Sequence, residues 1–508
     1  MHLLPLLLVL FSLPYPSLSS TNTSINWWCN QTPHPKACLY YLTHTPLPPK
    51  HKSDFYHLSL QVTFHNALRA QRRVQSLASR CRTEPRRTAW LDCHRLYTNT
   101  VLQLNRTLNP SPSCTSFDFQ TWLSAALTNL DTCRHGFSDL HQPPKLLSPL
   151  GKYNISELIS NCLAINKPQS TPKPDIPPWI TVANRKLLQI SSNANVVVAK
   201  DGSGDFTSIN AALNSAAAKT RSLNARFVIH VKRGVYSENV QIVSSMNNIT
   251  LVGDGMGRTV ITGRRSVSGG YTTFSSATFN VFGDGFIASG ITFRNTFGPG
   301  SQAVAMLSGS DRSVFYRCSF EGYQDTLFVY SQRQFYRECN IYGTIDFIFG
   351  NAAVVFQRCN IYVRKPRHGE ANAITAQGRL DKNQNTGIVI HSSNIRGTSD
   401  LRNAGKTVRS YLGRPWMRYS RTVLLKNYIE SIIDPAGWLQ FNGNFALDTL
   451  YYVEYKNTGA GSRLSKRVKW PGFHIVVRPS QVAQFTVANF IAGGSWITSA
   501  GVPFVSGL

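Results

Sequence analysis

Residues 302–351 decide the fold of this chain, and they read QAVAMLSGSDRSVFYRCSFEGYQDTLFVYSQRQFYRECNIYGTIDFIFGN. Short β-branched and aromatic runs recur here and just beyond: CSF begins at Cys318, CNI at Cys339 and CNI again at Cys359, at intervals of 21 and 20 residues. A self-similar period of about 20 residues with short glycine-bounded runs is typical of a parallel β-helix, in which each coil stacks on the preceding one. The hand should follow the right-handed crossover rule. The three cysteines fall one per coil with no histidine at ligand spacing, so we expect buried thiols rather than a metal site.

Two acidic residues of this stretch, Asp325 in YQDTL and Asp346 in IDFIFG, lie inside apolar and aromatic runs, where a carboxylate is costly to desolvate. They are 21 residues apart, which is one period, so the stack should place them one strand spacing of about 4.8 Å from each other. Gln302 precedes Asp325 by 23 residues, and Gln324 is its neighbour. We therefore expect Gln302, Gln324, Asp325 and Asp346 to form a row on one face.

This row, together with a later arginine, has the components of a hydrolytic site. Two close carboxylates do not both ionise easily, so one should act as a proton donor and the other as an anion. Arg414 in YLGRPW could hold one of them charged through two hydrogen bonds. The amides of Gln302 and Gln324 suit a developing oxyanion. A retaining glycosidase would also fit two carboxylates about 5 Å apart, and a structural ion pair is a further alternative, so these residues alone do not choose the reaction.

The N-terminal segment and the total charge indicate a secreted protein. Residues 1–20 have a short apolar core that ends in small residues, as expected of a cleaved signal peptide, with a signal anchor as the alternative. The net charge is +28, and the part after residue 188 holds 34 Lys and Arg against 17 Asp and Glu. Outside the cell such a surface favours an acidic polysaccharide as the partner. No nucleic-acid-binding motif is present. The alternative is a solvated basic surface that has no specific partner. Ten cysteines and five glycosylation sequons agree with the secretory path; the sequons begin at Asn22, Asn30, Asn105, Asn154 and Asn248.

The chain divides into a helical part, a linker and a strand-rich part. Residues 21–166 carry apolar residues at spacings of three and four in four segments, which predicts an all-α four-helix bundle. Residues 167–195 are rich in proline and contain the dibasic sequence RKLL at Arg185, Lys186, Leu187 and Leu188, which suits an accessible tether. Residues 196–508 are expected to form the all-β domain, with no membrane span after the signal peptide.

The helical part has an odd number of cysteines, so at least one thiol is left over. A bridge from Cys29 to Cys38 would close a short loop, and one from Cys93 to Cys133 would join two helices. The segments WCNQTPHPKAC (28–38), AWLDCHRLY (89–97), TWLSAALTNLDTC (121–133) and SNCLAI (160–165) resemble the plant invertase and pectin methylesterase inhibitor domain. The usual pairing of that family matches these two bridges, and the extra Cys81 and Cys114 could form a third.

The strand-rich part resembles plant pectin methylesterases over its whole length. The resemblance rests on GVYSE (234–238), QAVAM (302–306), YQDTL (323–327), DFIFG (346–350) and LGRPW (412–416). It implies that Asp346 is the nucleophile and Asp325 the general acid and base. It also implies that Gln302 and Gln324 form the oxyanion hole and that Arg414 orients Asp346. Trp416 and Trp438 would stack on sugar rings, and no cofactor or metal is implied.

The resemblance as a whole implies a secreted cell-wall pro-enzyme. Its substrate would be partly methyl-esterified pectin, and RKLL resembles the site at which a subtilisin-like protease cuts such pro-enzymes. The helical pro-domain, or a separate inhibitor protein, would act on the catalytic domain, and the enzyme is expected to be a monomer. Two rivals stay open at this point: a glycosidase or lyase of the same architecture, and a binding or inhibitory module that acts through its bundle.

Overall fold

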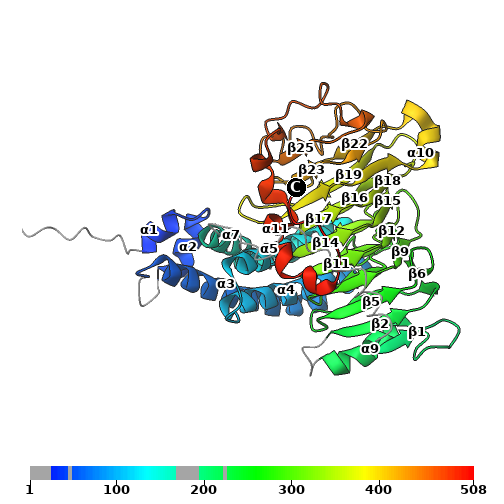
Figure 1. Ribbon diagram of the computed structural model, residues 1–508. Coiled ribbons are helices and arrows are strands. Elements are labelled where there is room, and N and C mark those ends of the chain that lie inside the picture. Colours follow the sequence, from blue (N-terminus) through cyan, green and yellow to red (C-terminus); the bar gives the residue numbers. More distant parts are fainter. Residues whose placement is uncertain (1–24, 44–48, 168–193, 221–225) are drawn as a thin grey trace, which may run out of the picture.

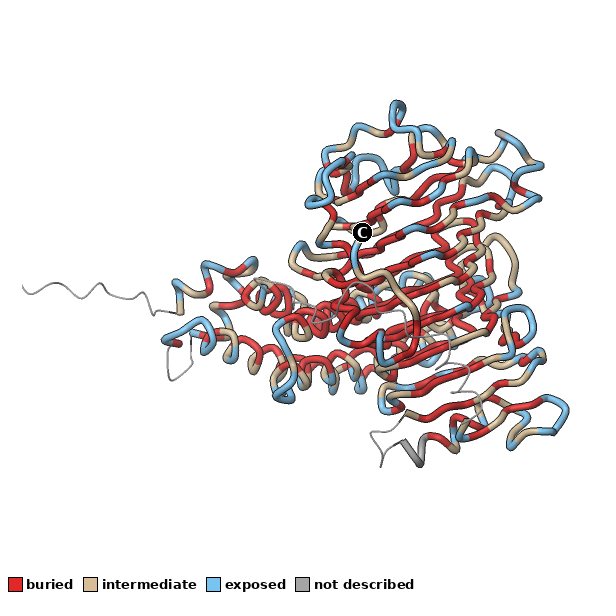
Figure 2. The backbone as a smooth tube through the Cα atoms, viewed as in Figure 1, coloured by how far each residue is buried: buried red, intermediate tan, exposed pale blue. Residues whose placement is uncertain are grey.

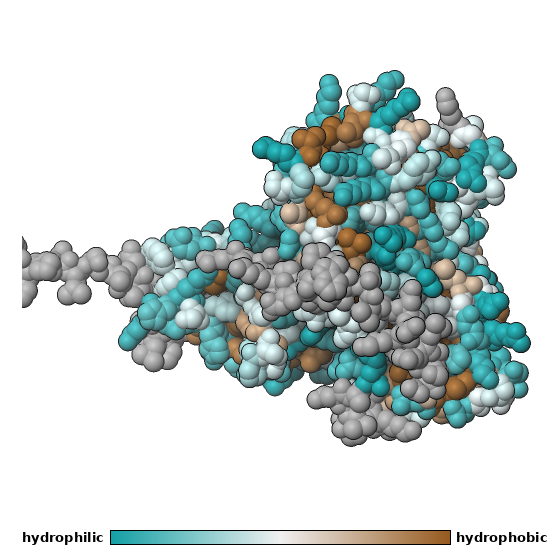
Figure 3. All heavy atoms as spheres, in the orientation of Figure 1, coloured by the Kyte–Doolittle hydropathy of each residue, from teal (hydrophilic) through white to brown (hydrophobic). Residues whose placement is uncertain are grey.

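The computed structural model describes residues 25–43, 49–167, 194–220 and 226–508. Over these residues it forms a helical bundle that packs against one side of a long β-helix (Figure 1). The signal peptide expected at residues 1–20 and the processing site expected at Arg185–Leu188 lie outside the described residues. No helix in the described part of the chain has both the length and the apolar character needed to cross a membrane. In the view of Figure 3, hydrophilic residues cover most of the surface and apolar ones form small scattered groups.

Long amphipathic helices form the bundle, as their apolar spacing predicts. Helix α5 differs from the others because it is buried on nearly all sides, from Phe117 to Phe137. A helix without an exposed face needs partners all round, and α5 finds them in the bundle on one side and in the β-helix on the other. The helices of this part are α1 (Ile25–Asn30), α2 (Pro35–Leu42), α3 (Lys52–Ser76), α4 (Glu84–Leu108), α5 (Ser116–Asp139), α6 (Ser148–Gly151) and α7 (Ile155–Asn166), with 3-10 turns η1 (Leu77–Arg80) and η2 (Pro144–Leu147).

Both expected disulfides are present in the bundle: Cys29–Cys38 closes the α1–α2 turn, and Cys93–Cys133 joins α4 to α5. The third bridge suggested between Cys81 and Cys114 is wrong, because both are free thiols. Helix α4 separates them: it has 25 residues and therefore extends for about 37 Å. Cys81 precedes its N-terminus and Cys114 follows its C-terminus, so the two thiols lie at opposite ends of the bundle.

The second part is the predicted parallel β-helix, and its described strands form three sheets. Figure 2 shows the strands almost continuously buried, while exposed residues gather in the turns. The first sheet contains, in spatial order, β1 (Val196–Val198), β2 (Phe227–Val231), β5 (Ile249–Gly253), β8 (Ile287–Ser289), β11 (Ser313–Tyr316), β14 (Arg333–Arg337), β17 (Ala353–Gln357), β20 (Gly387–His391), β23 (Arg421–Leu425), β25 (Tyr451–Tyr455) and β26 (Phe473–Ile475). The second contains β24 (Tyr428–Ile429), β21 (Asn394–Gly397), β18 (Asn360–Val363), β15 (Asn340–Gly343), β12 (Ser319–Glu321), β9 (Thr292–Asn295), β6 (Thr259–Gly263) and β3 (Gly234–Ser237).

The third sheet carries the residues predicted to be functional. It contains β22 (Ser410–Gly413), β19 (Asn372–Gln377), β16 (Ile345–Gly350), β13 (Leu327–Val329), β10 (Met306–Ser308), β7 (Phe279–Val281) and β4 (Val240–Ile242). Three helices and several 3-10 turns complete the domain: α9 (Ile209–Thr220), α10 (Ser399–Ala404), α11 (Val487–Phe490), η3 (Gly405–Thr407), η4 (Ala460–Ser462), η5 (Pro479–Gln481), η6 (Ala483–Phe485), η7 (Gly493–Ser495) and η8 (Thr498–Ala500). The C-terminal segment, whose structure the sequence did not predict, packs its apolar residues on the outer face of the first sheet.

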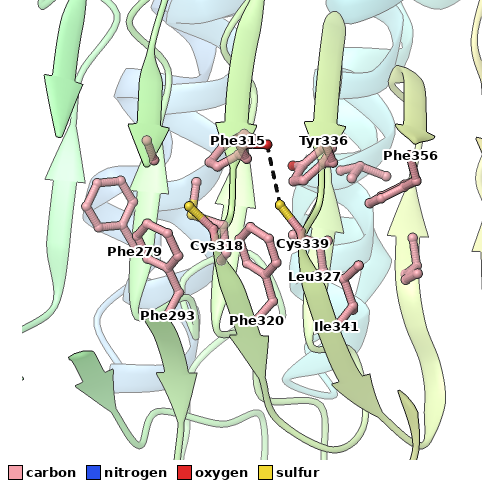
Figure 4. Packing of buried hydrophobic residues seen from close by; sticks show 14 of the residues in the cluster. Phe279, Phe293, Phe315, Cys318, Phe320, Leu327, Tyr336, Cys339, Ile341 and Phe356 are labelled. Carbon is pink, nitrogen blue, oxygen red and sulfur yellow. Dashed lines mark hydrogen bonds between the residues drawn. The ribbon is translucent and has the colours of Figure 1, made fainter. Parts of the chain in front are cut away.

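The repeat that predicted the fold fills the interior of the coils (Figure 4). The rings of Phe315, Tyr336 and Phe356 stack in successive coils, with centroids 4.5 Å and 4.6 Å apart. Cys318, Cys339 and Cys359 are fully buried free thiols, as expected. The thiol of Cys339 donates to the carbonyl of Phe315 at 3.4 Å. Each coil therefore repeats one layer of the same core.

Candidate active site

The two predicted aspartates lie side by side on neighbouring coils of the third sheet. β13 pairs with β16 in a register that sets Leu327 opposite Ile348, and Asp325 and Asp346 each lie two residues earlier. The backbone N–H of Asp325 donates to the carbonyl of Ile345 at 3.0 Å. Both aspartates have left-handed backbones, with φ of 59° and 51°. Such a conformation costs a non-glycine residue about 1–2 kcal/mol, and the strand pairing on both sides maintains it.

Arg414 holds the second of these carboxylates. It follows β22, two strands along the sheet from the β16 strand that carries Asp346. Its Nε donates to Oδ1 of Asp346 at 2.8 Å and its Nη2 to Oδ2 at 2.6 Å. The guanidinium carbon also lies 4.9 Å from the ring centroid of Phe441. This fork fixes the orientation of the carboxylate and favours its charged form.

The two carboxyls have different electrostatic surroundings. Burial raises the pKa of Asp325 well above its ordinary value; the charges of Asp346 and Asp139 raise it further, and Arg414 only partly opposes them. Burial also raises the pKa of Asp346, but here the hydrogen bonds and the charge of Arg414 act directly against the rise. When the pair carries one proton, Asp325 is therefore the better proton donor and Asp346 the better anion.

The predicted amides and one tryptophan line the same hollow, which we call the catalytic pocket. The N–H of Ala303 donates to the carbonyl of Gln324 at 3.3 Å, which joins the segments that carry Gln302 and Gln324. Trp416 lies over Gly378, where a Cβ would meet the indole at 2.7 Å, so only glycine leaves room for the ring. The pocket has a volume of about 170 Å³ and is lined by Thr132, His135, Gly136, Asp139, Thr273, Phe274, Gln302, Gln324, Asp325, Phe328, Asp346, Phe349, Ala376, Arg414, Trp416 and Phe441.

Trp438 does not belong to the catalytic pocket, so the expectation that it stacks on sugar rings is wrong. Its side chain is 1 % exposed, packs against the ring of Tyr452 with centroids 4.3 Å apart, and donates its indole N–H to Glu454 at 3.2 Å. It is a core residue with a satisfied polar atom. Phe441, which is 38 % exposed, is the aromatic side chain of this segment that reaches the pocket.

Helix α5 of the bundle covers the catalytic pocket, which the sequence alone did not predict. The ring of His135 lies 5.5 Å from that of Trp416, between centroids. The carboxylate of Asp139 accepts a hydrogen bond from the N–H of Thr273 at 2.8 Å. Gly136 lies between these two residues in the sequence and contributes to the same wall. The face of α5 that meets the β-helix carries Thr121, Ser124 and Thr128, which hydrogen-bond to Asn385 and Asn351. In the sequence these polar residues are typical of a face exposed to water, so they gave no signal of the contact.

Polar contacts across the interface between the bundle and the β-helix fix the position of the bundle. Arg333 of β14 is buried and binds Asp311 of its own domain at 2.6 Å and Asp118 of α5 at 2.7 Å. Asp92 of α4 accepts a hydrogen bond from Thr272 at 2.5 Å. Apolar residues of α4 and α5 share one buried cluster with residues of the third sheet. The two parts therefore meet through a continuous core and not only through surface contacts.

The comparisons with known proteins agree with this geometry. The family model described as Pectinesterase matches residues 195–494, and the one described as Plant invertase/pectin methylesterase inhibitor matches residues 23–165. The catalytic part places the protein among the carboxylic ester hydrolases. The chain belongs to the pectinesterase family, in the form that carries an N-terminal inhibitor-like domain.

Individual relatives support the assignment along the whole chain. Pectinesterase 2 of Citrus sinensis is 54% identical over 507 residues, which is 99% of this chain and 98% of that protein. The probable pectinesterase/pectinesterase inhibitor 17 of Arabidopsis thaliana is 54% identical over 489 residues, or 95% of this chain and 94% of the relative. Among solved structures, the pectin methylesterase from carrot is 51% identical with a TM-score of 0.60, and the match covers 62% of this chain and 98% of the carrot enzyme.

Proposed function

We propose that the catalytic domain hydrolyses the methyl esters of homogalacturonan in pectin, releasing methanol and free galacturonate carboxylates. The observation that carries this proposal is the carboxylate of Asp346, held in the arginine fork next to Asp325, whose pKa is raised. A nucleophile kept anionic beside an acid kept neutral is what ester cleavage without a serine requires. Two neighbouring carboxyls also occur in retaining glycosidases, so the geometry alone does not choose the reaction. Membership of the pectinesterase family favours the ester.

In the proposed reaction, an oxygen of Asp346 attacks the ester carbonyl carbon. The amide N–H groups of Gln302 and Gln324 donate to the oxyanion of the tetrahedral intermediate. When the intermediate collapses, the bond to the methoxy oxygen breaks and Asp325 gives its proton to the departing methanol. Asp325 then accepts a proton from water, whose oxygen attacks the acyl carbon of the anhydride. The bond to Asp346 breaks, and a second collapse returns both carboxyls to their starting states.

The aromatic side chains at the rim would bind the polysaccharide. Trp416 and Phe441 line the catalytic pocket beside Arg414, and aromatic faces pack well against the apolar faces of sugar rings. The contact of His135 with Trp416 occupies one of these faces in the present structure. The bundle and a substrate chain would therefore compete for the same surface.

We propose that the bundle inhibits the enzyme until the linker is cut. Helix α5 covers the catalytic pocket, and Asp139 places a carboxylate close enough to Asp325 to raise its pKa. A polysaccharide is much larger than the remaining 170 Å³, so it would reach the carboxyls only after the bundle has moved. Cutting by a subtilisin-like protease at RKLL, secretion to the cell wall and action as a monomer belong to the same proposal.

The test is methanol release from esterified pectin by a chain of residues 189–508. Asp346→Asn should lower the rate by a factor on the order of 10⁶, as loss of the nucleophile does in a serine hydrolase. Asp201→Asn removes an equal charge at an exposed site in the first turn of the domain and should leave the rate unchanged. Equal rates for the wild type and the Asp346 variant would reject the nucleophile. New reducing or unsaturated ends without methanol would instead show a glycosidase or a lyase.

A further inference from the structure

A second hollow lies at the end of the β-helix, outside the catalytic pocket. It has a volume of about 960 Å³ and lies between the α10–β22 connection, the segment after β24 and the segment after η4. We call it the basic groove. Its lining residues are Leu401, Arg402, Gly405, Val408, Arg409, Ser410, Glu430, Ser431, Ile432, Ile433, Asp434, Pro435, Ala460, Gly461, Arg463, Ser465, Lys466 and Arg467. It is larger than the catalytic pocket, and the proposed reaction does not use it.

The groove has an excess of positive charge that its own acids do not neutralise. Arg402 pairs with Glu430 at 3.4 Å, and Arg467 is held by buried Glu454 at 2.8 Å. The remaining cations are Arg409, Arg463 and Lys466. All three are exposed, and none forms an ion pair with another described residue.

The two acids of the groove already have partners. The carboxylate of Glu430 accepts from the N–H of Gly397 at 2.8 Å in addition to Arg402, and that of Asp434 accepts from the N–H of Ala436 at 2.9 Å. These hydrogen bonds hold the two carboxylates in place but leave them charged, so the five cations of the lining exceed Glu430, Asp434 and the adjoining Glu454 by two. The positive potential of the groove is left for an anionic ligand.

The floor of the groove is apolar. Val408, Ile432, Ile433 and Pro435 lie between the cations, and Ile433 is buried. An apolar floor with cations at the rim suits a ligand with apolar faces and regularly spaced negative charges. A chain of uronic acids has both, since its ring faces are apolar and each ring carries one carboxylate.

The groove is close to the catalytic strand yet free of the bundle. β22, whose Ser410 lines the groove, lies two strands from β16, which carries Asp346; two strand spacings amount to about 10 Å. All of the lining residues fall between 401 and 467, so none belongs to the bundle. Figure 1 shows α10 on the far side of the β-helix from helices α1 to α3.

We propose that the basic groove is a second polysaccharide site, which binds stretches of polyuronate with free carboxylates through Arg409, Arg463 and Lys466. Its identification as a site for pectin rests on the proposed function, whereas the binding itself does not need catalysis. Because the bundle leaves the groove open, the covered enzyme binds polyuronate as well. A chain held there carries its neighbouring rings towards the catalytic pocket once the bundle has left.

The experiment measures binding of a fully demethylated oligogalacturonide to the full-length chain carrying Asp346→Asn, at fixed ionic strength. Replacing Arg409, Arg463 and Lys466 by Gln should weaken binding about tenfold, as expected for three solvent-screened ion pairs. A second measurement uses the same oligomer with its carboxylates methyl-esterified and the full-length chain that carries only Asp346→Asn. Its affinity should fall to about that of the demethylated oligomer for the triple variant.

A matched control removes three charges at the opposite end of the β-helix. Lys200, Arg233 and Arg258 are exposed and lie near one another around Gly234, so replacing them by Gln lowers the net charge equally. If both triple variants weaken binding equally, or if neither does, the groove is not a site and the proposal is wrong. A thermal melt confirms that each variant is folded. Methanol release by wild-type residues 189–508 is measured separately, so failure of the groove and failure of the esterase are told apart.

Discussion

Asp92 should make docking of the bundle depend on pH. It is 3 % exposed at the interface, where Thr272 donates to it. Burial raises its pKa from 3.8 to about 6, with a smaller contribution from Asp139, while the hydrogen bond from Thr272 and the charge of Arg95 oppose the rise. In an undocked bundle Asp92 would face water and return to its ordinary pKa.

The sign of the effect follows from these two values. The docked state binds the proton more tightly, so the contribution of Asp92 to docking is complete below pH 3.8 and is lost as the pH rises through about 6. A shift of about 2 units corresponds to about 3 kcal/mol, or a factor of about 100 in the docking equilibrium. Burial also raises the pKa of Asp139 at the same interface, which changes docking in the same direction.

The assay uses a chain with a protease site inserted in residues 167–195, cut once so that the bundle binds as a separate fragment. Its dissociation constant is measured at pH 4 and pH 7. Asp92→Asn keeps the volume and the hydrogen-bond acceptor but removes the titration. In the wild type the dissociation constant should rise from pH 4 to pH 7, and in the variant this rise should be about 100-fold smaller. The remaining pH dependence comes from other carboxyls. If its pH dependence equals that of the wild type, the assignment to Asp92 is refuted.

Three further predictions concern the bundle. Gly136→Leu should release inhibition in the uncut chain, because even a Cβ would lie 3.2 Å from a β-helix side chain and overpacking costs about 1–3 kcal/mol. The control is Gly151→Leu, since a Cβ at Gly151 would meet nothing within 4 Å. Equal methanol release from the two variants would contradict the reasoning. Asp118→Asn should weaken docking by about 1–3 kcal/mol, since Asp118 binds a buried arginine at 2.7 Å; fragment binding as above checks this, and an unchanged constant would remove the contact from the docking energy. Removing the Cys93–Cys133 bridge, whose ends are 40 positions apart in the sequence, should destabilise the bundle by about 4 kcal/mol in urea unfolding; a change below 1 kcal/mol would argue against it.

The fold and the row of catalytic candidates could be predicted because both depend on one periodicity. In a parallel β-helix, the distance along the chain between equivalent residues is one coil, so 21 residues between Asp325 and Asp346 become one strand spacing. The register of β13 on β16 agrees with this. The sequence could name Arg414 as the partner of a carboxylate, but it could not show which carboxylate Arg414 contacts, because that depends on how the segment after β22 folds.

The predictions for Trp438 and for the third disulfide were wrong because the sequence shows which residues are present but not where a loop or a helix places them. Trp438 belongs to an aromatic cluster, and whether such a ring faces the interior or the rim depends on the path of the loop that carries it. Cys81 and Cys114 are left over by the family's two bridges and so could pair, but the length of α4 keeps them apart. The docking of α5 depends on complementarity between two domains, which no pattern within either one encodes.

The shared core of bundle and β-helix has a consequence for processing. Cutting the linker breaks one peptide bond but leaves every contact of the buried cluster in place. It does change the kind of equilibrium: before the cut the bundle is present at the high effective concentration of a tethered partner, and afterwards its binding obeys mass action. Release then becomes a matter of dilution, so under the proposed inhibition the cut chain would be silent at high concentration and active once its fragments are diluted.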